Sequence, residues 1–144
     1  MLAENTVLTG RRAITRSYAK INLTLDVLSK RENGYHDIKM IMQTVSLFDL
    51  ILVDKTHRGI SISTNLPYLP CNEKNIAYKA ADAFFKATGI RGGAKIVIHK
   101  NIPVAAGLAG GSGNCAAVLT AINMLHGNPL SNDELMHIGA SLGA

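Results

Sequence analysis

The sequence is poor in aromatic residues and in cysteine. It has no tryptophan, four tyrosines and three phenylalanines, too few for the stacking rings on which proteins bind single-stranded nucleic acid. Cys71 and Cys115 are its only cysteines, which argues against a disulfide framework and predicts a cytoplasmic protein, and their spacing predicts no metal site. No apolar run approaches the roughly 20 residues that span a bilayer, and no secretory signal is present, so no membrane partner is expected.

The composition is that of a globular domain. Hydrophobic residues make up 47% and charged residues 17% of the chain, and its 144 residues fit one domain. The net charge of +5 is compatible with an anionic ligand, but a small excess of Lys and Arg also serves to keep a surface in solution. Both interpretations stay open. The basic residues are spread along the chain rather than clustered, which argues against a nucleic-acid partner.

The most informative segment runs from Pro103 to Ala117 and reads PVAAGLAGGSGNCAA. Four of the seven positions from Gly107 to Gly113 are glycine, with a strand pattern before the segment and a helix pattern after it. Glycine lets backbone N–H groups turn inward, and a helix start adds unpaired donors and a positive dipole end. Such a loop suits a polyphosphate. It is not a Walker A loop, because no Gly-Lys-Ser/Thr closes it.

The predicted elements indicate an α+β fold, a mixed β-sheet packed by helices, because strands and helices do not alternate strictly. Alternating apolar residues predict a long strand over residues 14–28, and two apolar runs over residues 38–54 are divided near Phe48-Asp49. The other predicted elements are an edge strand at 59–65, a helix at 75–88 ended by Gly89, a strand at 94–99, a helix from Ala116, and a last helix begun by a capping box at Ser131–Glu134 and ended by Gly143. Residues 1–13 are predicted to be a flexible leader and residues 14–144 the domain.

A second group of polar residues lies on and after the first long strand. Lys20 and Asn22 share one face of an ideal strand, and a turn then presents Tyr35 and His36 together. The lysine can stabilise developing negative charge, the tyrosine ring can stack on a base, and the histidine can hydrogen-bond a polar ring edge. Taken singly, each also fits a solvated or packing role.

Three motifs in order resemble the 4-diphosphocytidyl-2-C-methyl-D-erythritol kinase family. They are Ala19-Lys-Ile-Asn-Leu23, Lys30-Arg-x-x-Gly-Tyr-His36 and the segment from Ile102 to Ser112. That family belongs to the galactokinase, homoserine kinase, mevalonate kinase and phosphomevalonate kinase (GHMP) superfamily, and the resemblance covers about Ile14 to Ala144. It implies the superfamily's N-terminal domain fold, which is like domain 2 of ribosomal protein S5.

The resemblance also implies an activity and a set of site residues. The activity is transfer of the ATP γ-phosphoryl group, assisted by Mg²⁺, to the 2-hydroxyl of diphosphocytidyl methylerythritol, a step of non-mevalonate isoprenoid biosynthesis. Lys20 corresponds to the catalytic lysine and Asn22 to a substrate contact, while Tyr35 stacks on the cytosine and His36 hydrogen-bonds to it. The implied ATP-binding residues are Asn75, beside Ile76 at a helix start, and Pro103, Val104, Ala105, Ala106, Gly107, Leu108, Ala109, Gly110, Gly111, Ser112, Gly113 and Asn114.

The sequence departs from the family pattern in three places, one of which is Tyr18 before Ala19-Lys20, where many family members have proline. The family's partner aspartate follows a Leu-Gly-Ala segment, and this sequence ends at Leu142-Gly143-Ala144. We therefore expect an N-terminal half that lacks the C-terminal domain and is inactive alone, with turnover restored when the second half is added. The family usually has Gly-Gly-Ser-Ser where Gly113 stands here, so a hydroxyl able to meet phosphate or Mg²⁺ is missing.

Three other functions are alternatives to an active kinase. Gly111 to Ala116 satisfies the dinucleotide fingerprint G-x-G-x-x-A, but its strand ends too early and a second strand does not follow. A basic domain of this fold could bind RNA, with a steep salt dependence. A truncated kinase could also be retained as a non-catalytic nucleotide-binding fragment.

Apolar segments such as Met40-Ile-Met42 and the last helix further predict self-association, which sedimentation as a clean monomer would contradict.

Overall fold

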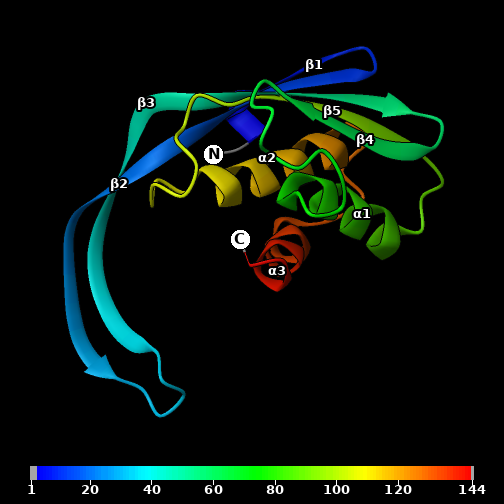
Figure 1. Cartoon of the computed structure of the whole chain (residues 1–144). Coiled ribbons are helices and arrows are strands. Elements are labelled where there is room, and N and C mark those ends of the chain that lie inside the picture. Colours follow the sequence, from blue (N-terminus) through cyan, green and yellow to red (C-terminus); the bar gives the residue numbers. More distant parts are fainter. Residues whose placement is uncertain (1–2, 144) are drawn as a thin grey trace.

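The computed structural model describes residues 3–143, in which a mixed β-sheet carries three α-helices on one face (Figure 1). The elements are a 3-10 turn at Ala3–Asn5, β1 (Thr6–Thr9), β2 (Arg12–Lys30), β3 (His36–Thr56), β4 (Gly59–Thr64), α1 (Ile76–Thr88), β5 (Gly93–His99), α2 (Gly110–Leu125) and α3 (Asn132–Ser141). Within the described range, no helix is both long and apolar enough to cross a membrane. The predicted α+β class with a mixed sheet is confirmed.

The strand order is β1-β2-β3-β5-β4. Neighbouring strands are antiparallel except β4 and β5, which are parallel and are joined through α1. The strand predicted over residues 59–65 is therefore an edge strand, as expected. The carboxyl end of β5 leads directly into the glycine-rich segment, which places that segment at one end of the sheet.

The predicted flexible leader is largely part of the sheet. Thr6–Thr9 forms β1 and pairs with the start of β2, and the Thr6 hydroxyl donates to the Thr15 hydroxyl at 2.9 Å. The expected boundary at residue 14 falls inside β2, which begins at Arg12. A four-residue strand is too short to reveal itself by alternation, and the pairing comes from a tight turn with Gly10 at φ 58°. Met1 and Leu2 lie outside the described residues.

The two apolar runs of residues 38–54 form one continuous strand. β3 extends unbroken from His36 to Thr56, and Asp49 lies within it with no exposed surface. An aspartate inside an apolar run resembles an interruption, but here its carboxylate is paired with Lys100 of the neighbouring segment. The predicted division near Phe48-Asp49 is therefore wrong.

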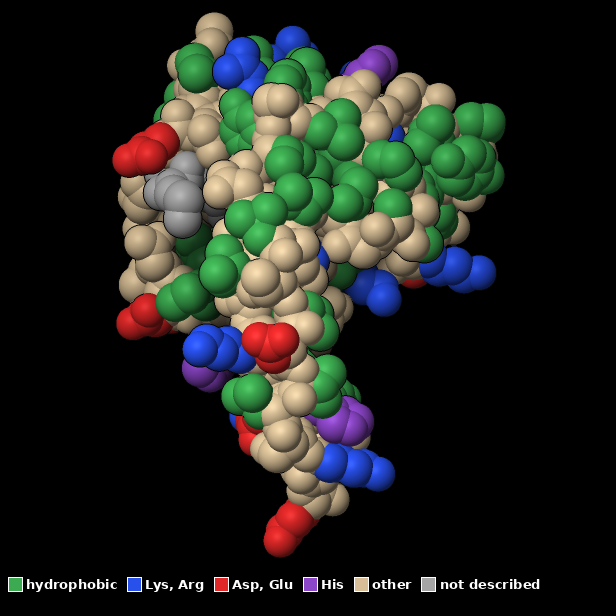
Figure 2. Space-filling model, turned by 90° about the vertical axis from the view of Figure 1, so that its left-hand side faces the viewer, with side chains coloured by type: hydrophobic (Ala, Val, Ile, Leu, Met, Phe, Trp, Pro, Cys, Tyr) green, Lys and Arg blue, Asp and Glu red, His purple; other side chains and the backbone are tan. Residues whose placement is uncertain are grey.

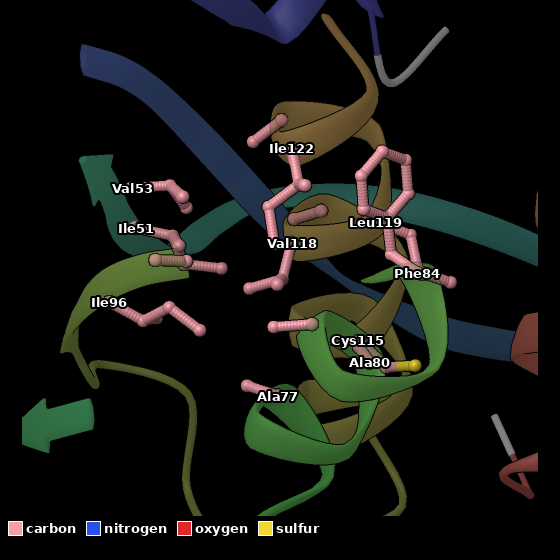
Figure 3. Close-up of a cluster of buried hydrophobic side chains, with 14 of the residues drawn as sticks. Ile51, Val53, Ala77, Ala80, Phe84, Ile96, Cys115, Val118, Leu119 and Ile122 are labelled. Carbon is pink, nitrogen blue, oxygen red and sulfur yellow. The ribbon is translucent and has the colours of Figure 1, made fainter. Parts of the chain in front are cut away.

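The core lies between the sheet and the helices. Side chains of β3 and β5 point toward those of α1 and α2, and Figure 3 shows Ile51, Val53 and Ile96 facing the helical layer. The helical side is contributed by Val118, Leu119, Ile122, Phe84 and the small residues Ala77 and Ala80, all at most 2% exposed. Small residues on α1 let it pack closely against α2.

The helix ends predicted from sequence are confirmed for α1 and α3. Asn75 caps α1 by accepting from the Ala77 N–H at 3.0 Å, and Gly89 ends it in the left-handed region at φ 66°. The Ser131–Glu134 capping box is present, and α3 stops at Ser141 with Gly143 two residues later at φ 80°. Helix α2 begins at Gly110, six residues earlier than predicted.

Beyond the sheet, β2 and β3 continue as a curved two-stranded arm, residues 21–42 (Figure 1). Figure 2 shows the arm projecting below the body of the molecule. Its apolar side chains lie in solvent: Leu23, Val27 and Met42 are 57%, 60% and 60% exposed. By contrast, the last helix buries its apolar side, since Leu135 is in the core and Ile138 and Leu142 pack against it. Of the two segments predicted to be unpartnered, only the arm is exposed along its length.

The two free cysteines should differ sharply in reactivity. Cys115 has no exposed surface, and burial raises the pKa of its thiol to about 11, whereas Cys71 is exposed. The thiolate is the reactive form, so we expect iodoacetamide at pH 8 to alkylate only Cys71 of the native chain, and both in urea. Intact-mass spectrometry counts the adducts. Two rapid adducts on the native chain would contradict the packing of α2 against α1 and the sheet.

Candidate functional site

A cavity of about 460 Å³ lies between the glycine-rich segment and the start of α1. One wall is the segment itself, from Pro103 to Ser112, with Asn114. The opposite wall includes apolar residues that suit a planar ring, namely Leu69, Pro70, Ile76 and Ile98. The charged residues among those lining it are Lys74 and Lys100, both basic. The cavity therefore combines apolar side chains with basic ones and has no acidic residue among the described residues that line it.

The backbone of the glycine-rich segment turns repeatedly through the left-handed region. Ala105, Gly107 and Ala109 have φ of 59°, 72° and 61°. Alanine adopts this conformation at a cost, so its presence at two positions marks a loop whose path is fixed by its surroundings. Successive N–H groups in such turns form concave sites for anions.

The N-terminus of α2 is open toward this cavity. Its cap residue Ala109 makes no side-chain hydrogen bond, and its first turn contains no acidic residue. The first N–H groups of the helix thus lack a side-chain partner and add to the positive end of the helix dipole. Gly110, Gly111 and Ser112 line the cavity at this point. The predicted glycine loop is in fact a loop followed by the first helical turn, and both parts face the same space.

Asn114 lies one turn into α2 and also lines the cavity. It is 4% exposed, and its side-chain oxygen has no hydrogen-bond partner. A buried amide oxygen left unpaired costs free energy that a bound proton donor or cation recovers. Asn114 is therefore the clearest sign within the cavity that a ligand completes it.

Gly113 is the predicted loop residue that does not line the cavity. A Cβ at this position would lie 2.5 Å from the Ser17 hydroxyl oxygen on β2. A serine at position 113 would therefore point at the sheet, and the expected loss of a phosphate-facing hydroxyl does not follow from this geometry. Ser17 is 1% exposed and its hydroxyl has no partner, so it occupies the space that Gly113 leaves.

The close approach of Gly113 to Ser17 predicts that a smaller residue at position 17 compensates for a larger residue at position 113. Gly113→Ala should lower the free energy of unfolding by about 1–3 kcal/mol through overpacking against Ser17. Ser17→Ala should cost little alone, because it removes an unpaired buried hydroxyl, and should recover most of the loss when combined with Gly113→Ala. Urea denaturation measures all three variants. The matched control is Gly111→Ala in the same helical turn, where the added Cβ meets nothing within 4 Å; an equal loss there would refute the steric explanation.

Lys20 and Asn22 lie beside the glycine-rich segment. The Lys20 N–H donates to the Leu108 carbonyl at 3.1 Å, and its ammonium donates to the Asn22 side-chain oxygen at 3.3 Å. The pairing of β2 with β3 shifts register between Tyr18 and Lys20, and such an irregularity re-aims side chains. The sequence prediction that Lys20 and Asn22 act together fits this contact, although neither lines the cavity.

Tyr35 and His36 lie at the far end of the arm. They follow the turn after Lys30, where the Arg31 N–H bonds to the Tyr35 carbonyl at 2.6 Å. Tyr35 is 74% exposed, and neither residue lines the cavity. The structure thus places the two predicted base-binding residues together but apart from the glycine-rich segment.

Asn75 lines the cavity while its side chain is engaged locally. Besides capping α1, its amide donates to the Pro70 carbonyl at 2.9 Å. It therefore fixes the wall formed by Pro70 and Ile76.

The described residues contain no group of three or more His, Cys, Asp and Glu placed to hold a metal ion.

Sequence reasoning missed Lys100, which lines the cavity yet is almost fully buried. Its position directly after β5, at the start of the glycine-rich segment, was the available signal. Its partner Asp49 lies 51 residues away in sequence, and no local pattern links the two.

The dinucleotide alternative does not fit the order of elements. After α2 the chain enters α3 at Asn132 rather than a second strand of a βαβ unit. The fingerprint match at Gly111–Ala116 lies within α2 itself. The cavity beside this helix is therefore not the crevice of a Rossmann fold.

Comparison with known proteins gives consistent matches. The profile of the family described as "GHMP kinases N terminal domain" matches residues 75–144. The "4-diphosphocytidyl-2-C-methyl-D-erythritol kinase" of Clostridium botulinum (strain Alaska E43 / Type E3) is 50% identical over 129 residues, which cover 90% of this chain and 46% of that protein. The protein of the same name from Caldicellulosiruptor saccharolyticus is 51% identical over 132 residues, covering 91% of this chain and 46% of its own length.

Solved structures agree with these sequence matches. The crystal structure of a 4-(cytidine 5'-diphospho)-2C-methyl-D-erythritol kinase superimposes with a TM-score of 0.79 at 35% identity, covering 91% of this chain and 46% of that one. The Methanococcus jannaschii mevalonate kinase has a TM-score of 0.67 at 17% identity, a likeness of fold alone. The chain thus spans about half the length of the curated relatives it matches.

Proposed function

Because this chain belongs to the GHMP kinases and has the sequence and fold of their N-terminal domain, we propose that it is the ATP-binding half of a small-molecule kinase. The substrate proposed is 4-diphosphocytidyl-2-C-methyl-D-erythritol, the compound in the names of the relatives at about 50% identity. Its 2-hydroxyl would accept the γ-phosphoryl group of ATP. The observation that carries the proposal is the cavity beside the open N-terminus of α2.

The residues that line the cavity suit both the phosphates and the base of a nucleoside triphosphate. N–H groups at the start of α2 and in the Pro103–Ala109 turns favour the phosphates, and the field of Lys74 and Lys100 has the matching sign. Ile76, Pro70 and Leu69 offer an apolar surface for the adenine ring. Catalysis of phosphoryl transfer is mainly positioning and charge stabilisation, which a rigid loop of this kind supplies.

Lys20 is the proposed catalytic lysine, with Asn22 holding its ammonium. The backbone bond from Lys20 to Leu108 ties the strand to the phosphate-binding loop. Tyr35 and His36 are the proposed cytosine contacts, and their exposure on the arm leaves both rings free to stack and to hydrogen-bond.

Mg²⁺ fits the oxygen atoms present in the cavity. Asn114 supplies a buried amide oxygen without a partner, and Ser112 a hydroxyl in the same helical turn. Amide, hydroxyl and water oxygens are suitable ligands for Mg²⁺, which keeps several waters and binds substrate phosphates. When bound, the ion would neutralise charge on the phosphates, while Asn114 and Ser112 would fix its place relative to the loop.

Two measurements test the proposal. Isothermal titration calorimetry of the chain with ATP and Mg²⁺ should show saturable binding, and no heat at millimolar ATP would overturn the ATP-binding assignment. The second measurement is turnover by a fusion of this chain to the second half of the Clostridium botulinum relative. Phosphorylation of diphosphocytidyl methylerythritol by the fusion, but not by the chain alone, is expected. ATP binding without turnover in a folded fusion would instead favour the non-catalytic nucleotide-binding alternative.

The exposed arm supports the proposal that the isolated chain self-associates. Leu23, Val27 and Met42 lie in solvent at half or more of their surface, and exposed apolar side chains of this kind drive association. Sedimentation velocity should show the apparent mass rising with concentration. Leu23→Ser with Val27→Ser should suppress that rise; an unchanged rise would place the contact elsewhere.

A further inference from the structure

A buried ion pair lies where β5 passes into the glycine-rich segment. The Lys100 ammonium donates to the Asp49 carboxylate, and the two side chains are 5% and 0% exposed. Removing two charges from water is costly, and a buried pair is often no more stabilising than apolar residues of the same size. Its position beside the cavity points to a role other than stability.

Asp49 fixes residues 100–102, which lead from β5 into the glycine-rich segment. Besides Lys100, its carboxylate accepts from the N–H groups of Asn101 and Ile102, each at 2.8 Å. The Asn65 side chain holds the Lys100 backbone, accepting from its N–H at 2.7 Å and donating to its carbonyl at 3.1 Å. Lys100 is therefore held at its backbone by Asn65 and at its ammonium by Asp49.

The Lys100 ammonium lies directly behind the first turn of α2. A Cβ on Gly110 would lie 3.0 Å from the Lys100 ammonium nitrogen, so the absence of a side chain at Gly110 allows the approach. The pair therefore lies behind the helix start, with Lys100, and not Asp49, among the residues that line the cavity. A positive charge at a helix N-terminus is unfavourable unless an anion is nearby, and in the chain without ligand Asp49 is that anion.

We propose that Lys100, positioned by Asp49, selects for polyphosphate in the cavity, so that it raises affinity for ATP over AMP. The proposal rests on the proposed nucleotide site. Lys74, the other basic lining residue, is exposed, so salt should screen its contribution far more than that of Lys100.

The test is the ratio of ATP to AMP affinity, measured by calorimetry for Lys100→Gln, Asp49→Asn and Lys74→Gln at 0.05 M and 0.5 M salt. Lys100→Gln should lower the ratio about tenfold at both salt concentrations, as expected for a charge a few ångströms away in a partly buried site. Lys74→Gln should lower it only at low salt. Asp49→Asn keeps a hydrogen-bond acceptor for the Lys100 ammonium and removes the carboxylate that repels phosphate, so it should keep or raise the ratio.

A merely structural role would give Lys100→Gln and Asp49→Asn the same effect, because each breaks the pair; that result overturns the proposal. If either variant fails to fold, the double variant, in which both charges are replaced by amides, should show the lowered ratio, and a wild-type ratio there overturns it too. Inorganic tripolyphosphate is the separate anion probe. If the wild-type chain binds tripolyphosphate but not ATP, the nucleotide site is refuted while the role of Lys100 stands, and Lys100→Gln must then weaken tripolyphosphate binding. If the chain binds neither tripolyphosphate nor ATP, both the nucleotide site and the role of Lys100 are refuted.

Discussion

Asp49→Ala should lower the free energy of unfolding by about 3–5 kcal/mol, the usual cost of leaving one partner of a buried ion pair uncompensated. Lys100 would remain with its side chain only 5% exposed and without its carboxylate. The N–H groups of Asn101 and Ile102 would lose their acceptor in the same step. Urea denaturation of the 144-residue chain, followed by circular dichroism, measures the change.

The matched control is Asp54→Ala on the same strand. Asp54 also pairs with a basic residue, Arg12, at 2.6 Å, but the two side chains are 22% and 48% exposed. The hydrogen bond from Arg12 holds the pKa of Asp54 below its ordinary value, so whatever the pair contributes is present at neutral pH and is lost as the pH falls through that lowered pKa. Because exposed pairs are screened by water, Asp54→Ala should change stability little. Equal losses for the two aspartates would show that the Asp49 carboxylate is not buried as described.

Much of the fold follows from local sequence signals. Alternation identifies β2, and the Ser131–Glu134 capping box and Gly89 place helix ends correctly, because each depends on residues within a few positions of one another. The glycine-rich segment is also visible in sequence, since its proposed role of binding phosphate requires backbone N–H groups that glycine leaves accessible.

Features that depend on distant partners could not be predicted in this way. Asp49 interrupts an apolar run and resembles a break, because its partner Lys100 lies on another segment. Gly113 comes close to Ser17 of β2, which no local pattern reveals, and the short strand β1 is held by its pairing with β2. In each case a tertiary contact overrides the local pattern.

The arm explains why the site residues predicted from sequence are separated here. Lys20 is held at the base of the arm by its bond to Leu108, whereas Tyr35 and His36 lie at its tip. The family resemblance implies that both groups bind substrate, but their distance apart is set by strand length, at about 3.3 Å per residue. A substrate that contacts both Lys20 and the Tyr35–His36 pair must therefore be long, or a further surface must complete its binding site.

Lys20→Gln should reduce turnover of the fusion enzyme by about 10²–10³-fold, the range seen when one group that stabilises transition-state charge is removed. Because Lys20 does not line the cavity, ATP affinity should stay within a few-fold of the unsubstituted value, so the loss should fall on kcat rather than on the KM for ATP. The matched control is Lys95→Gln, which removes an exposed lysine from β5 and should leave both constants unchanged. A loss confined to the KM for ATP would make Lys20 a nucleotide-binding residue, and unchanged turnover would remove it from the chemistry. Only a loss in kcat with ATP binding intact fits a lysine that acts on the transferring phosphoryl group.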